Sequence, residues 1–151
     1  MTISLELEVS IGRPADDVFA HLTDLEHWPE WLIASGIVRV EVLDPGPLAA
    51  GTRLRIDQRV AGRAASLDGH VTTLDTPSRF AVTGRDKDGI TVEIDGTLLP
   101  DGSTTRLRWT LKVGLPLRYR VLESMATPQV RRAAALDLEA FRQRLEADAG
   151  A

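Results

Sequence analysis

The chain has 151 residues, no cysteine and a net charge of −4, from 18 basic and 22 acidic residues. We expect a single domain over residues 1–151, because a domain of about 150 residues buries roughly 70% of the surface of its unfolded chain. The lack of cysteine excludes disulfides and thiolate metal sites, and the three histidines are scattered, so we expect no metal and no other cofactor. Acidic residues interspersed among the arginines argue against a nucleic-acid partner.

The first predicted element is a strand. From Ile3 to Ile11, apolar residues alternate with polar ones, which is typical of a strand with one wet face. This opening has neither the basic start nor the apolar run of a signal peptide, and no segment of the chain approaches the roughly 20 apolar residues of a membrane helix. We therefore expect a cytoplasmic protein without a membrane span.

Two short helices are predicted next. A proline and two acidic residues suit the first turn of a helix from about Pro14 to Thr23. A second helix is predicted from Leu25 to Leu32, with Asp24 as its candidate N-cap and a break or restart at its internal proline. This second segment holds two of the three tryptophans, Trp28 and Trp31.

A run of strands occupies the middle of the chain. The turns between them are short, and parallel neighbours would need long crossovers, so the strands form an antiparallel meander. Together with the first strand there are seven. The six expected here, each with period-two alternation, are Gly36–Asp44, Thr52–Val60, Arg63–Leu74, a short strand around Phe80 and Val82, Ile90–Leu98 and Thr104–Val113.

The last part of the chain has helical periodicity. From Leu115 onward, apolar residues recur at steps of three or four, as at Val130, Ala134 and Leu138. We predict a long C-terminal helix that is bent or interrupted near Thr127–Pro128, because proline lacks a backbone donor and crowds the preceding turn.

Three stretches carry a family resemblance, in the order given: IGRPADDVFAHLTDLEHWPEWL, VTTLDTPSRF and DGSTTRLRWTL. With the order of elements, they make the chain similar to the START-like superfamily, in particular the polyketide cyclase/dehydrase and lipid-transport group, also called SRPBCC proteins. The resemblance implies an α+β helix-grip fold: a seven-stranded, curved antiparallel sheet wrapped around the C-terminal helix, with an apolar cavity between them. It does not imply one activity, since this fold hosts carriers, cyclases and interaction modules.

The inward parity of the strands is almost free of ionisable groups. We therefore expect the cavity to bind a small hydrophobic molecule, such as a polyketide, lipid, isoprenoid or aromatic metabolite. Gln58 either orients a carbonyl or hydroxyl of this ligand or is a satisfied core amide. Trp31 is either a pocket wall or lid supported by Trp28, or both pack in the core. The predicted ligand contacts are Trp31, Leu32, Ile56, Gln58, Val71, Ile94, Trp109, Leu122 and Met125.

Two alternatives stay open. A polyketide cyclase or dehydratase acting on a poly-β-ketone in the same cavity would need an acid or base there, with His70, Tyr119 and Asp95 as candidates. His70 and Asp95 fall on the outward parity, although a β-bulge would reverse the parity of His70. A ligand-free protein-interaction module would instead have a filled interior. The sequence leaves both a monomer and a dimer open.

Overall fold

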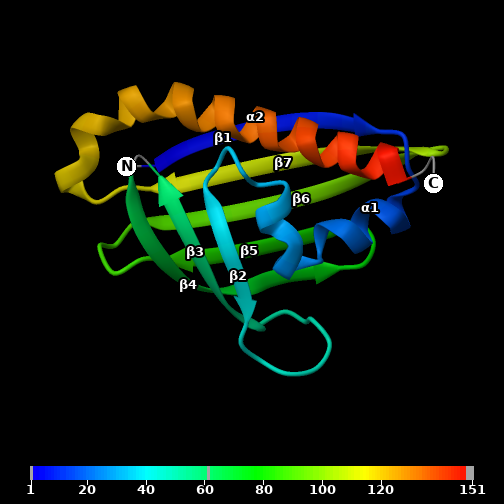
Figure 1. The fold of residues 1–151 in the computed structure, drawn as a ribbon, viewed down its shortest axis with the longest axis horizontal. Helices are drawn as coiled ribbons and strands as arrows, with labels where there is room; N and C mark the ends of the chain where they lie inside the picture. Colours follow the sequence, from blue (N-terminus) through cyan, green and yellow to red (C-terminus); the bar gives the residue numbers. More distant parts are fainter. Residues whose placement is uncertain (1, 61, 149–151) are drawn as a thin grey trace.

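A computed structural model describes residues 2–60 and 62–148 and has the predicted α+β fold (Figure 1). Seven antiparallel strands form one sheet in the order β1-β7-β6-β5-β4-β3-β2, and the C-terminal helix lies over one face of it. The elements are β1 (Thr2–Ile11), α1 (Ala15–Leu22), η1 (Leu25–Glu30), β2 (Ile37–Val42), β3 (Arg53–Val60), β4 (Arg63–Asp75), β5 (Arg79–Arg85), β6 (Thr91–Asp101), β7 (Thr104–Gly114), η2 (Leu117–Leu122) and α2 (Glu123–Asp148).

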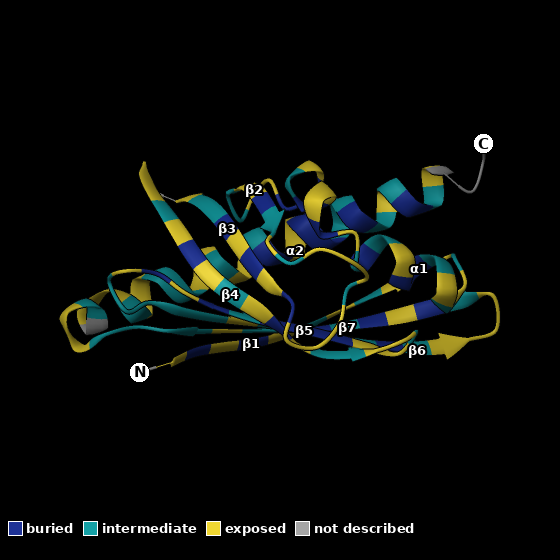
Figure 2. Cartoon of the chain, turned by 90° about the horizontal axis from the view of Figure 1, so that it is seen from below, coloured by how far each residue is buried: buried dark blue, intermediate teal, exposed yellow. Residues whose placement is uncertain are grey.

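The meander predicted from the short turns is confirmed. Strand β1 extends it at one edge by pairing with β7, from Thr2 opposite Gly114 to Ile11 opposite Thr105. The turn between β5 and β6 contains Gly89 at φ +88°, a conformation that glycine adopts without strain. The sheet is curved, so that β2, β3 and β4 rise beside α2 (Figure 2).

The second predicted helix is a 3₁₀ helix, η1, and not an α-helix. Pro29 lies inside it and cannot donate a backbone hydrogen bond, which favours this short, tight form. Asp24 makes no side-chain capping bond; its carboxylate lies 2.9 Å from Nδ1 of His27 instead. Asp24 therefore occupies the predicted N-cap position, but its side chain does not cap the helix.

The C-terminal helix was predicted to be bent or interrupted near Thr127–Pro128. It is not interrupted there, since α2 runs from Glu123 through Pro128 to Asp148. The hydroxyl of Thr127, immediately before the proline, donates a hydrogen bond to the carbonyl of Glu123, four residues earlier (2.8 Å).

In strand β2, one side chain does not face the side of the sheet that strict alternation predicts. The pairing of β2 with β3 shifts register between Ile37 and Arg39, so Ile37 packs against the core while Val38 is 60% exposed. Strict alternation over the predicted strand Gly36–Asp44 gives Val38 the same inward parity as the buried Val40, and the β-bulge reverses that parity in a way the pattern does not reveal.

The core is an aromatic cluster between the sheet, η1 and the second half of α2. Trp28 is fully buried, and its indole N–H donates to the carbonyl of Leu22 (2.8 Å). The cluster holds edge-to-face pairs such as Trp28 with Trp31 and with Trp109, at centroid distances of 6.1 and 6.3 Å. On the α2 side, the ring of Phe141 packs against Trp31 with a centroid distance of 4.4 Å and an angle of 41° between the ring planes.

Helix α1 approaches the sheet closely over a glycine. A Cβ at Gly96 of β6 would lie 3.0 Å from Cδ2 of Leu22, which is tighter than ordinary van der Waals contact. The absence of a side chain at Gly96 therefore lets the buried Leu22 reach the sheet.

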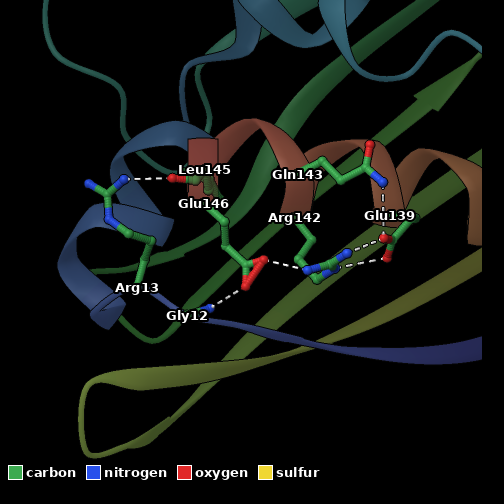
Figure 3. Close-up of polar contacts among 7 residues, drawn as sticks. All are labelled: Gly12, Arg13, Glu139, Arg142, Gln143, Leu145 and Glu146. Carbon is green, nitrogen blue, oxygen red and sulfur yellow. Dashed lines mark hydrogen bonds and ion pairs between the residues drawn. The ribbon is translucent and has the colours of Figure 1, made fainter. Parts of the chain in front are cut away.

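Polar contacts fix the C-terminal half of α2 to the corner between β1 and α1 (Figure 3). Arg13 donates to the carbonyl of Leu145 (2.7 Å), and the backbone N–H of Gly12 donates to Glu146 (3.2 Å). Arg142 bonds both Glu139 and Glu146 along the helix. The buried residues of α2 begin at Ala134 and lie toward its C-terminal end (Figure 2).

Candidate functional site

A cavity of about 420 Å³ lies between the sheet and the first half of α2. Small-molecule sites typically occupy roughly 300 to 1,000 Å³, so this space can hold a small organic molecule. The sheet contributes mainly apolar side chains, among them Ile56, Leu67, Val92, Ile94, Trp109 and Leu111. Helix α2 contributes the apolar residues Ala126, Val130, Ala133, Ala134 and Leu138 and the polar residues Gln129 and Asp137.

Side-chain size along α2 explains why the interior is hollow in this region. Three of the helix residues that face the cavity are alanines, whereas the residues that face the core further along the helix are Leu138, Phe141 and Leu145. The small side chains leave space between helix and sheet that the large ones fill.

The two ends of the cavity differ. At one end the lining residues Trp28 and Leu32 are buried and belong to the aromatic core. At the other end Arg63 is exposed and Ile90 and Leu115 are half-buried, so this end is the open one, which we call the mouth.

A second, more open hollow of about 920 Å³ lies outside the mouth and is lined largely by charged residues of β3, β4 and the β5–β6 turn. It shares Gln58, Arg63, Ala65 and Asp86 with the apolar cavity. We regard the smaller cavity as the candidate site because it is more enclosed and mostly apolar, as ligand sites usually are.

A polar network closes one side of the cavity. The Asp137 carboxylate on α2 is buried and accepts backbone N–H bonds from Ala34 (2.8 Å) and Ser35 (2.9 Å). The side-chain amide of Gln58 donates to the carbonyl of Ser35 (3.0 Å). This network joins α2, the loop between η1 and β2, and β3, and all of its members line the cavity.

Burial raises the pKa of the Asp137 carboxyl above its usual range. The hydrogen bonds from Ser35 and Ala34 favour the charged form and oppose this effect, but the loss of solvation is the larger cause. Asp137 is therefore a buried acid at the wall of an otherwise mostly apolar space.

At the mouth, the buried carboxylate of Asp86 accepts backbone N–H bonds from Asp88 and Ile90, both at 2.9 Å, which shapes the β5–β6 turn. Arg63 lies 3.8 Å from Asp86 and pairs with Asp88. These ionic contacts connect the beginning of β4 to the turn beside the mouth.

Five of the predicted ligand contacts line the cavity: Leu32, Ile56, Gln58, Ile94 and Trp109. Gln58 was predicted either to orient a ligand or to be a satisfied core amide. In the structure it lines the cavity, and its side-chain amide also donates to a backbone carbonyl.

The other four predicted contacts are not part of the lining. Trp31 and Val71 are buried in the core, and the tryptophan that reaches the cavity from η1 is Trp28. Leu122, the last residue of η2, and Met125, in the first turn of α2, are 50% and 70% exposed, so both side chains face solvent.

The three candidate catalytic residues are not brought together, and none lines the cavity. His70 in β4 lies opposite Arg53 in β3. The pairing of β4 with β5 does shift register, but only after His70, between Val71 and Thr73. Asp95 forms an ion pair with Arg79 (2.5 Å). Tyr119 lies in η2, where the guanidinium of Arg118 is 5.0 Å from its ring.

The prediction missed Asp137, Ser35 and the mouth residues Arg63 and Asp86. A signal for Asp137 was present, because it follows Val130 by seven residues and Ala134 by three and so lies on the apolar face of the helix. The other three residues come together only through the loop and turn geometry.

Within residues 2–60 and 62–148, no group of three or more histidine, aspartate or glutamate side chains is arranged to hold a metal ion. No helix in the same part of the chain is both long and apolar enough to cross a membrane.

A curved antiparallel sheet that encloses an apolar cavity with a C-terminal helix defines the helix-grip class of proteins. Comparison with known families agrees with this assignment. The model of the family described as polyketide cyclase / dehydrase and lipid transport matches residues 2–146, and the chain belongs to this family. The resemblance predicted from the three sequence stretches is confirmed.

Individual relatives are more distant. A protein of Mycobacterium tuberculosis, Rv1546, is 27% identical over 128 residues, which is 85% of this chain and 88% of the relative. The structure is similar to that of the Zhui aromatase/cyclase from Streptomyces sp. R1128, at 19% identity and a TM-score of 0.78 over 97% of this chain and 94% of that one. It is also similar to a START superfamily protein from Mycobacterium smegmatis, at 17% identity and a TM-score of 0.74 over 95% and 97% of the two chains.

Proposed function

We propose that the protein binds a small hydrophobic molecule, such as a polyketide, lipid, isoprenoid or aromatic metabolite, in the cavity beneath the first half of α2. The observation that carries this proposal is the mostly apolar space of about 420 Å³ in a family named for polyketide and lipid chemistry. Burial of an apolar ligand surface there would stabilise the native state by roughly 25 cal/mol per Å² before the costs of binding.

The polar network gives the ligand an orientation. Gln58, Ser35 and Asp137 lie together on one side of the cavity, while most of the remaining lining is apolar. We propose that a ligand hydroxyl or carbonyl faces this side and that the apolar body lies against Ile56, Ile94 and Trp109.

The test is a thermal denaturation screen of the protein with a panel of fatty acids, isoprenoid alcohols and polycyclic aromatic phenols. A ligand that binds only the native state raises Tm, and at about 100 times its Kd it adds about 2.7 kcal/mol to the free energy of unfolding. Ala133→Leu fills the cavity and should abolish the rise in Tm for any compound found.

Ala135→Leu is the matched control, because it makes the same substitution on the exposed face of α2 and should leave the rise unchanged. If no compound in the panel raises Tm, or if the two variants respond alike, the cavity is not the binding site.

A second candidate function is polyketide cyclisation or dehydration in the same cavity, and the buried carboxylate of Asp137 favours it. A general base must lie within hydrogen-bond reach of the proton it removes, and Asp137 is an acid at the cavity wall with a raised pKa. Turnover of a poly-β-ketone that is lost in Asp137→Asn while binding of the same compound persists would support this function. Binding without turnover in the wild type would exclude it for that compound.

A further inference from the structure

Four large apolar side chains gather on the outside of the molecule where β7 leads into α2. Leu117 is 78%, Val121 80%, Leu122 50% and Met125 70% exposed, and we call these four residues the apolar strip. In the rest of the described chain, the exposed large apolar residues are separated in sequence, as at Ile33 and Leu43. Scattered exposed apolar residues are normal in monomeric proteins, whereas a cluster marks an interaction surface.

The segment of sequence that contains the apolar strip has a net charge opposite in sign to that of the whole protein. Residues 115–136 contain four arginines and one glutamate, a net charge of +3, while the rest of the chain carries −7. Arg131 and Arg132 are exposed. Met125 and Arg132 are seven residues apart, which places them two turns apart on the same side of α2.

The apolar strip adjoins the mouth of the cavity. Leu115, just before the strip, and Ala126, just after it, both line the cavity. Arg118 in η2 donates to the backbone carbonyl of Asp88 and lies 3.8 Å from its carboxylate, so η2 is held beside the β5–β6 turn. Figure 1 shows η2 and the beginning of α2 at one end of the molecule, away from the β2–β3 loop.

We propose that the apolar strip and its arginines dock on the surface of an anionic lipid bilayer. The apolar side chains insert among the acyl chains near the headgroups, and Arg131 and Arg132 pair with lipid phosphates, as in helices that lie on a membrane without crossing it. A second copy of the chain fits this surface less well, because a two-fold interface would bring two patches of charge +3 together. Docking in this orientation points the mouth of the cavity at the bilayer, so an apolar molecule passes between them with little exposure to water.

The experiment is sedimentation of the full chain with vesicles of phosphatidylcholine alone and of phosphatidylcholine mixed with phosphatidylglycerol. We expect binding to the mixed vesicles that weakens as salt is raised, because the Debye length shortens from about 10 Å at 0.1 M to 3 Å at 1 M. Leu117→Ser with Val121→Ser should lower the affinity about tenfold or more by removing two apolar anchors. Arg131→Gln with Arg132→Gln should weaken binding to the mixed vesicles.

The matched control is Ile33→Ser with Leu43→Ser, two exposed apolar residues outside the apolar strip, which should leave vesicle binding unchanged. Failure of the wild type to bind mixed vesicles, or equal losses in the two serine pairs, overturns the proposal. So does a change of mass in light scattering on substitution of the apolar strip, combined with no vesicle binding, since the surface is then a protein interface. Ligand binding, measured without vesicles by thermal denaturation, succeeds or fails independently of these outcomes.

Discussion

The two halves of α2 cover two different interiors. The second half packs Leu138, Phe141 and Leu145 into the aromatic core and is fixed by Arg13 to the β1–α1 corner. The first half presents alanines to the sheet and lies over an open-ended cavity. One half of the helix thus covers the part of the molecule that holds the fold together, and the other half covers the part that leaves room for a ligand. Most of this difference comes from the size of the side chains that the helix presents.

The largest expected effect comes from truncating a core residue of the second half. Phe141→Ala removes a fully buried ring that stacks on Trp31, and it should lower the free energy of unfolding by about 3 to 5 kcal/mol. Val130 is a half-buried residue in the first half of α2. Val130→Ala should lower the free energy of unfolding by only about 1 kcal/mol, since the lost methyl groups are already partly exposed. Urea denaturation of both variants checks the contrast, and equal losses would contradict it.

A smaller effect on the free energy of unfolding is expected from substitution of Asp137, which lies where the two halves of α2 meet. Its raised pKa means that the folded protein binds this proton more tightly than the unfolded chain does. The wild type should therefore gain stability relative to Asp137→Asn as the pH falls from above the folded pKa toward the ordinary value for aspartate. This difference between the two proteins, measured by urea denaturation from pH 8 to pH 4, isolates Asp137 because the other carboxyl groups are common to both. A wild type that loses stability relative to Asp137→Asn as the pH falls would contradict the expectation.

The smallest effect, in this case on ligand binding, is expected from substitutions on the sheet face opposite the cavity. Asp95→Asn breaks the ion pair with Arg79, and His70→Ala removes a side chain that lies outside the cavity lining. Neither should alter the rise in Tm that a bound apolar compound produces, whereas Ala133→Leu should abolish it. A loss of ligand response in either variant would mean that the binding region extends beyond the cavity.

The fold was predictable because strong periodicity carries through almost every element. Alternation identified all seven strands, and the helical pattern of Val130, Ala134 and Leu138 identified α2. The difference falls where local geometry overrides the pattern, since a register shift in β2 exposes Val38. The second short helix was predicted, but alternation and helical spacing did not indicate that it is a 3₁₀ helix.

The site was less predictable than the fold. Parity along a strand indicates which residues face inward, and it placed Ile56, Gln58 and Ile94 at what proves to be the cavity. It does not indicate where the interior is filled and where it is hollow, so Val71, an inward residue, lies in the core. The positions of Leu122 and Met125 depend on how the chain rotates as it passes from η2 into α2, which helical spacing alone does not determine.

The aromatic cluster has a practical consequence, because it contains all three tryptophans of the chain. Trp28 and Trp109 line the cavity, and Trp31 lies 5.9 Å from Trp109, close enough for excitation energy to pass between the rings. Intrinsic fluorescence therefore reports on the cavity from its own wall. An apolar guest that lowers the polarity beside these indoles should shift the emission to shorter wavelengths, so occupancy can be followed without a dye or label.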